Sequence, residues 1–283
     1  MKKMAKVLFF LACPVLSLTL VTCGSNKGAD EILNSTAFTP SSLSGLQLWL
    51  SAGSISGVSN GGTVATWTDL STNGNNVTQA TQANRPTLTS SAINGLPAVH
   101  FNGSTMDIGC TSCTFSFSGM EAFVIARVNS TSANVGVINF IDAGTIDYVA
   151  GNSVQVWDTG FNGGPASGAD ARWGSSNTGV SNITLTVTQY LLYGFSASGS
   201  NAAVSIKLRS NGTQFATGTQ NENILHTPTR VLIGARYQTV GSPNAIDSFA
   251  NIDVAEIIVY GAALSDTNRQ QVEQYLNSKY KIY

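Results

Sequence analysis

Charged residues are scarce in this chain, which has only 14 lysines and arginines and 15 aspartates and glutamates among its 283 residues. Ser, Thr, Asn and Gly stand where Lys and Glu usually occur, yet the hydrophobic fraction of 42% is ordinary for a folded domain. After Lys6 the sequence contains no cluster of basic residues. Nucleic-acid binding depends on clustered Lys and Arg, so this scarcity argues against a nucleic-acid partner.

Catalytic motifs are scarce as well. The only histidines are His100 and His226, and two isolated histidines do not make a hydrolase triad. A glycosidase needs two carboxylates that flank the scissile bond. The nearest pair in the second half is Asp253 and Glu256, and a separation of three in an extended strand is expected to place them on opposite faces. We therefore predict that the protein is not an enzyme, and a divergent glycoside hydrolase is the least favoured alternative.

The N-terminal residues form an export signal. Three lysines precede the apolar run 7–21, whose length suits a secretory signal peptide and is short for a membrane-spanning helix. The sequence Leu20-Val-Thr-Cys23 at its end resembles the lipobox of bacterial lipoproteins, with Thr22 in place of the usual Gly or Ala. The resemblance implies that residues 1–22 are removed and that Cys23 is acylated. It predicts an exported outer-membrane lipoprotein, facing the periplasm or the cell surface. An ordinary signal peptide with a nearby cleavage site is the alternative.

Two further cysteines, Cys110 and Cys113, belong to the exported part. Their C-x-x-C spacing fits a redox pair, half of a zinc site or a short structural disulfide. The residues after Cys113 are strand-like rather than helical, and the two histidines are the only further nitrogen ligands for zinc. We expect a disulfide, which suits an oxidising compartment.

The rest of the chain consists of short β-type runs separated by turn residues. Asn-Gly pairs such as Asn94-Gly95 and Asn211-Gly212 are strong hairpin signals. The glycine-rich stretch 161–179 is interpreted as a long surface loop, and Ser265 caps a single C-terminal helix. The expected strands include residues 46–50, 64–68, 87–89, 98–101, 121–128, 135–141, 153–157, 184–197, 202–209, 213–217, 230–236 and 252–260. This pattern predicts an all-β antiparallel sandwich with a short C-terminal helix.

Several of these blocks resemble bacterial LamG-like domains, which belong to the concanavalin A-like lectin/glucanase jelly rolls. The blocks are Leu46-Gln-Leu-Trp-Leu50, Trp67-Thr-Asp-Leu-Ser-Thr-Asn-Gly-Asn-Asn76, Arg85-Pro-Thr-Leu88, Ile93-Asn-Gly-Leu-Pro-Ala-Val-His-Phe-Asn-Gly103 and Ile252-Asp-Val-Ala-Glu-Ile-Ile-Val-Tyr260. The resemblance implies a jelly roll in which the first and last strands lie side by side, but no particular activity. The chain is thus divided into a signal peptide (1–22), a flexible tether (23–45) and one LamG-like domain (46–283).

Candidate ligand-binding residues bracket the glycines of the 161–179 stretch: Trp157, Asp158 and Phe161 on one side, Arg172 and Trp173 on the other. An aromatic ring face combined with polar hydrogen-bonding groups is a common way to hold a sugar. We predict a non-catalytic recognition module that binds glycans or matrix glycoproteins in cell adhesion. Two alternatives remain open: both tryptophans pack the loop onto the sheet, or the protein is a structural envelope component without a soluble ligand.

A metal site is the last candidate. Asp69, Asn73 and Asn75, with Gly74 between them, have the opening oxygen spacing and turn glycine of a calcium loop. The twelfth position is Ala80 rather than a bidentate Glu. Calcium binding and a hydrogen-bonded Asx turn both fit this loop, and the missing Glu favours the turn. No other cofactor is indicated.

Overall fold

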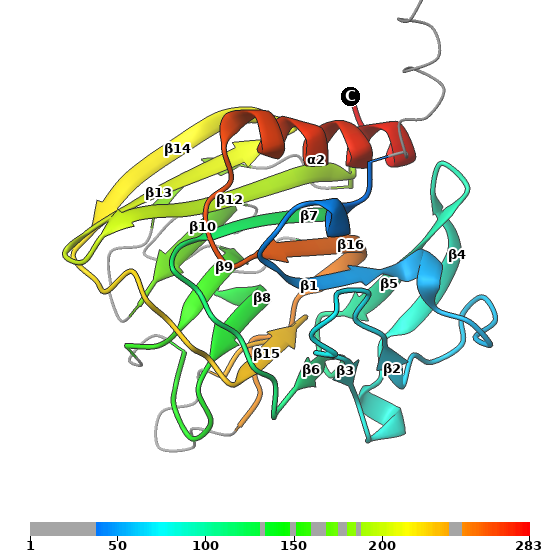
Figure 1. Cartoon of the computed structure of the whole chain (residues 1–283). Coiled ribbons are helices and arrows are strands. Elements are labelled where there is room, and N and C mark those ends of the chain that lie inside the picture. The colour runs from blue at the N-terminus through cyan, green and yellow to red at the C-terminus, as the bar shows by residue number, and fades with distance from the viewer. Residues whose placement is uncertain are drawn as a thin grey trace, which may run out of the picture. The chain divides into compact units, whose positions relative to one another are not determined.

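The computed structural model describes residues 38–283, apart from 131–133, 148–150, 160–167, 175–179, 185–187 and 238–244. Residues 38–283 form one compact unit (Figure 1). Its strands are β1 (Leu46–Ser51), β2 (Thr66–Trp67), β3 (Val77–Thr78), β4 (Thr87–Ile93), β5 (Leu96–Asn102), β6 (Ile108–Cys110), β7 (Met120–Val128), β8 (Val135–Ile141), β9 (Val154–Thr159), β10 (Gly168–Trp173), β11 (Val180–Thr184), β12 (Leu191–Ser200), β13 (Ala203–Ser210), β14 (Thr213–Gln220), β15 (Arg230–Ile233) and β16 (Asn251–Tyr260). Its helical segments are the 3₁₀ turns η1 (Pro40–Ser42), η2 (Ala52–Ser54) and η3 (Gln82–Asn84) and the α-helix α2 (Asp266–Tyr280). No helix in the described ranges is long and apolar enough to cross a membrane.

The strands form two antiparallel sheets. In sheet A the order is β14-β13-β12-β7-β16-β5-β4, and β1 also pairs with β16. In sheet B the order is β11-β10-β9-β8-β15-β6-β3-β2. The sequence prediction of an all-β antiparallel jelly-roll sandwich with a C-terminal helix is therefore confirmed.

The main hydrophobic core lies between the two sheets. Alternate residues of each strand point into it, because successive side chains of a strand face opposite ways. Three tryptophans, Trp67, Trp157 and Trp173, are fully buried there. Consequently each sheet has an inner face toward this core and an outer face away from it.

The terminal strands meet as the sequence resemblance implies. Leu46 of β1 pairs with Tyr260 of β16 in an antiparallel register. The hairpin between β13 and β14 turns at Asn211 and Gly212, whose φ angles of 51° and 75° are both positive. A type I′ turn requires positive φ at both central positions, which Asn and Gly adopt most readily.

Helix α2 covers the outer face of sheet A (Figure 1). The Ser265 side chain accepts a hydrogen bond from the Asn268 backbone N–H at 3.2 Å, as expected of an N-cap. Val272 and Leu276 are fully buried against the sheet. The helix thus covers part of the outer face of sheet A, over β7, β12 and β16.

Two expectations about the strands were wrong. The stretch 161–179 contains a strand, β10, in which Ala169, Ala171 and Trp173 point into the core. The expected single strand 184–197 is interrupted: β11 ends at Thr184, β12 begins at Leu191, and Thr188 has a φ of 72°. The small residues that alternate along β10 gave no clear strand pattern in the sequence. The left-handed backbone conformation of Thr188 interrupts the expected strand 184–197.

The expected opposition of Asp253 and Glu256 was also wrong. The register of β16 against β7 shifts between Val254 and Glu256, so the strand contains one extra residue at a bulge. A bulge moves every later side chain to the other face. Asp253 and Glu256 therefore both point to the outer face of sheet A, where they contact separate sets of residues.

Candidate functional site

The predicted aromatic platform does not lie on a surface. Trp157 is fully buried in the core, and its ring stacks on Tyr193 at 4.6 Å between centroids. Trp173 is equally buried, and its Nε1 donates to the Asn223 carbonyl at 2.7 Å. Both residues sit at inward positions of β9 and β10, which explains why neither ring face is open to a sugar in this arrangement.

Asp158 and Arg172 point the other way, to the outer face of sheet B, and are only 1% and 2% exposed. Their charged atoms lie 3.8 Å apart, and Arg236 Nη1 lies 3.6 Å from the same Asp158 oxygen. Arg236 also donates to both carboxylate oxygens of Asp147, at 2.8 and 3.0 Å. Burial raises the pKa of Asp158, and the two neighbouring guanidinium groups oppose that rise. These charged residues form a buried ion network. Phe161, the remaining candidate residue, lies outside the described residues.

A row of polar side chains crosses sheet B beside this network. Asn139, Gln155 and Arg172 are paired across β8, β9 and β10 and share the outer face. Gln155 is 1% exposed, yet neither atom of its amide has a hydrogen-bond partner in the described structure. Sequence reasoning missed Gln155, because one polar residue in a short strand gives no signal until its neighbours are known.

The candidate calcium loop is filled by hydrogen bonds. The Asp69 carboxylate accepts from the backbone N–H groups of Trp49, Ser71 and Asn75 at 2.9 Å each, and from the Ser71 hydroxyl at 2.6 Å. Asn73 uses its side-chain nitrogen to donate to the Leu46 carbonyl at 2.8 Å. The arrangement is the Asx turn that formed the alternative expectation. Among the residues described, no group of three or more His, Cys, Asp or Glu side chains could hold a metal ion.

The structure joins Cys110 and Cys113 in a disulfide with an S–S distance of 1.98 Å. The bond closes a short loop directly after β6, which lies between β15 and β3 in sheet B. The proposed lipid-bearing Cys23 lies outside the described residues.

The acidic residues on the outer face of sheet A are held by structural partners. Asp253 accepts from His100 Nδ1 at 2.7 Å and from Arg127. Burial alone would raise its pKa, but these hydrogen bonds hold the pKa below its usual value. Glu121 is 2% exposed and accepts from the Ser196 hydroxyl at 2.7 Å. Burial raises the pKa of Glu121 to about 7.

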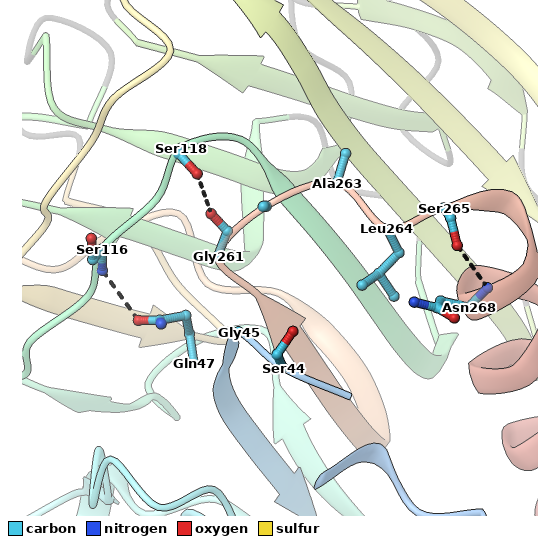
Figure 2. A pocket seen from close by; sticks show the side chains of 11 residues that line it. Ser44, Gly45, Gln47, Ser116, Ser118, Gly261, Ala263, Leu264, Ser265 and Asn268 are labelled. Carbon is cyan, nitrogen blue, oxygen red and sulfur yellow. Dashed lines mark hydrogen bonds between the residues drawn. The ribbon is translucent and has the colours of Figure 1, made fainter. Parts of the chain in front are cut away.

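Figure 2 shows a pocket of about 400 Å³ that lies where the start of β1, segment 116–118 and the link from β16 to α2 meet. Its polar lining consists of hydroxyl and amide side chains, and small residues such as Gly261 and Ala263 complete the wall. No lining residue is charged. The polar residues are Ser44, Gln47, Ser116, Ser118, Ser265 and Asn268.

Two amides in this pocket have free hydrogen-bonding capacity. Gln47 Oε1 accepts from the Ser116 backbone N–H at 3.1 Å, whereas its Nε2 has no partner in the described ranges. The Asn268 side chain likewise makes no hydrogen bond to another described residue, and it lies beside Ser265 in Figure 2. The pocket can therefore donate to and accept from hydroxyl groups, but it contains no acid or base. Sequence reasoning missed it, because its lining comes from three segments that are far apart in the sequence.

No protein-family model matches the chain, and no curated protein matches it by sequence. Among solved structures, the sialidase of Trypanosoma rangeli in complex with sialic acid is similar with a TM-score of 0.53 and 10% identity, covering 87% of this chain and 34% of that one. Domain 4 of an extracellular arabinanase from Geobacillus stearothermophilus, in complex with arabinotriose, gives 0.52 and 14% identity, covering 81% and 97%. The binding domain of Paraclostridial Mosquitocidal Protein 1 gives 0.52 and 13%, covering 82% and 52%.

The chain spans about a third of the length of the sialidase chain that it matches. With identities of 10–14%, these likenesses show a shared β-sandwich fold and leave the activity to be argued from the site.

Proposed function

We propose that this protein is an exported, lipid-anchored envelope protein whose LamG-like jelly roll recognises neutral glycans or glycoproteins in adhesion, without catalysing a reaction. The observation that carries this proposal is the pocket of Figure 2, which offers hydroxyl and amide groups and no titratable side chain. Sugars present arrays of hydroxyl groups that hydrogen-bond with such side chains. Glycoside hydrolysis, by contrast, needs two carboxyl groups at the scissile bond.

The likeness to a solved arabinanase domain in complex with arabinotriose supports the same proposal, because it extends over 97% of that domain. The sequence blocks that resemble LamG-like domains support it as well. The structural engagement of Asp253 and Glu121 on sheet A favours recognition over hydrolysis. A structural envelope protein without a soluble ligand is the competing function.

The test is a glycan array followed by calorimetric titration of the full-length chain. Asn268→Ala removes an uncommitted amide from the pocket. Ala262→Trp places an indole at the lining of the pocket, where it should obstruct a ligand. Gln270→Ala is the matched control, because Gln270 is an exposed amide on the same helix. We expect both pocket variants to lose affinity and the control to keep it. No saturable binding of any glycan by the native chain would favour the structural alternative.

Anchoring is tested separately. We propose that Cys23 carries the acyl chains, because the sequence before it resembles a lipobox. Labelling cells with a fatty-acid analogue should mark the native chain and leave a Cys23→Ser variant unmarked. Equal labelling of both proteins would refute the lipobox assignment.

A further inference from the structure

One wall of the Figure 2 pocket is the link 261–265, which joins β16 to α2. At one end of the link, the Gly261 N–H donates to the Gly45 carbonyl at 2.8 Å; at the other end, α2 begins. Between them, the Leu264 N–H donates to Glu121 Oε2 at 3.4 Å. In the part of the chain that the structure describes, no other backbone N–H in the middle of the link donates a hydrogen bond. Glu121 therefore ties the middle of this wall to sheet A.

The other oxygen of Glu121 is held more tightly. Oε1 accepts from the Ser196 hydroxyl at 2.7 Å and lies 3.4 Å from Arg209 Nη1. Arg209 Nη1 also donates to Ser196 Oγ at 2.6 Å, so the three side chains contact one another. Because two donors already face Oε1, a proton that binds this carboxyl group is expected on Oε2. A protonated oxygen is a weaker acceptor than a carboxylate oxygen, so protonation should loosen the hydrogen bond from Leu264.

The charged and titratable groups around Glu121 and its two partners come from three elements. They are Arg209 of β13, Asp266, Arg269 and Glu273 of α2, and Tyr260 of β16. Arg269 is itself engaged by Glu273 at 2.7 Å, and the Tyr260 hydroxyl donates to the Pro40 carbonyl at 2.8 Å. Both arginines favour the charged form of Glu121, but burial has the larger effect and raises the pKa of Glu121 to about 7.

We propose that Glu121 is a positioning residue for the Figure 2 pocket: its carboxylate holds the link at Leu264, and protonation of that carboxylate loosens the link and weakens ligand binding. Glu121 is not among the residues that line the pocket, so it acts through the Leu264 backbone. Ser265 and Asn268, two of the polar lining residues, follow directly after Leu264 and depend on where the link lies. For its ligand, this inference rests on the proposed glycan recognition.

The first measurement needs no ligand. It follows the backbone amide NMR signal of Leu264 in the full-length chain from about pH 5.5 to about pH 8.5. In the native chain the signal should shift with a midpoint near the pKa of Glu121, at about pH 7. In Glu121→Gln it should not titrate in this range, because an amide does not ionise. This variant keeps an oxygen that can accept from Ser196, so it should fold.

Two further variants sharpen the assignment. Ser196→Ala removes a hydrogen bond that lowers the pKa of Glu121, so the midpoint of the Leu264 signal should move to higher pH. This variant leaves Glu121 in place and provides the same test if Glu121→Gln does not fold. Asp266→Asn is the matched control, because it removes an exposed carboxylate from the first turn of the same helix. It should titrate like the native chain.

The second measurement is calorimetric titration over the same pH range with the neutral sugar that binds best in the glycan array. Native affinity should be about three- to ten-fold lower below the midpoint than above it, the range expected for the loss of one hydrogen bond. Glu121→Gln should bind with the lower affinity at every pH. In Ser196→Ala the fall in affinity should begin at a higher pH, and Asp266→Asn should follow the native chain.

Each contrary result has a definite meaning. A native Leu264 signal that does not titrate near pH 7, or that titrates equally in Glu121→Gln, overturns the positioning role even if the sugar binds. A signal that titrates as expected, with an affinity that is the same at every pH, overturns the effect on binding and leaves the proposed function standing. If no glycan binds at any pH, the proposed function fails, and the control of binding by Glu121 fails with it.

Discussion

Replacing the buried carboxylate of Asp107 should stabilise the protein. Its pKa rises from 3.8 to about 6 on folding, so the folded state holds a proton that the unfolded state has released between these pH values. Stability therefore falls as the pH rises through this window, and the full penalty is present above about pH 6. Asp107→Asn removes the ionisable group and keeps its shape.

The size of the effect follows from the same shift. A change from 3.8 to about 6 corresponds to about 3 kcal/mol at most, because each pKa unit is about 1.4 kcal/mol. Some solvent screening remains, so we expect a gain of about 1–3 kcal/mol above neutral pH. In a domain of this size each kcal/mol raises the melting temperature by about 2–4 °C.

The assay is chemical and thermal denaturation of the native chain and of Asp107→Asn at about pH 8 and about pH 4. Other titrating groups, such as Glu121, are common to both proteins and cancel in the comparison. The stability difference should be large at the higher pH and nearly vanish at the lower one. A variant that is no more stable at either pH would refute the reasoning.

Three further predictions concern buried polar groups. Glu256 is fully buried beneath α2 and accepts hydrogen bonds from Trp49 Nε1 at 2.7 Å, from the Tyr280 hydroxyl at 2.6 Å and from Lys279 Nζ at 2.5 Å. Glu256→Gln should therefore lower the free energy of unfolding, measured by urea denaturation, by about 1–3 kcal/mol. An unchanged denaturation midpoint would contradict this structural role. Gln155→Met removes two unpaired amide atoms and should leave stability equal or higher by about 1–2 kcal/mol; a large loss would mean that the amide has a partner. Burial lowers the pKa of His226 from 6.5 to about 4. The contribution of its neutral imidazole to the stability of the folded state is therefore present above about pH 6.5 and is lost as the pH falls toward 4. His226→Phe should make the stability less sensitive to acid, and an identical dependence of stability on pH in both proteins would argue against this.

The parts of the fold that depend on local chemistry could be predicted from the sequence. Ser265 caps α2 because its hydroxyl accepts an N–H of the first turn, and Asn211-Gly212 turns a hairpin because both residues tolerate positive φ. The pairing of β1 with β16 followed from the family resemblance. Predicting these features requires only residues that are close in the sequence, or a fold that is already known.

The features that depend on register could not be predicted. Trp157 and Asp158 are adjacent, yet one points into the core and the other away from it; sequence proximity had placed both in one site. The bulge before Glu256 leaves no mark in the sequence of β16. Asp107 gave no signal, because the cavity that it lines with Tyr237 forms only in the folded chain.

The most direct test of sugar recognition is a crystal structure of the full-length chain soaked with the neutral sugar that binds it best in solution. The account predicts density for the sugar in the pocket beside Asn268. A sugar bound elsewhere, with this pocket empty at saturating concentration, would contradict it.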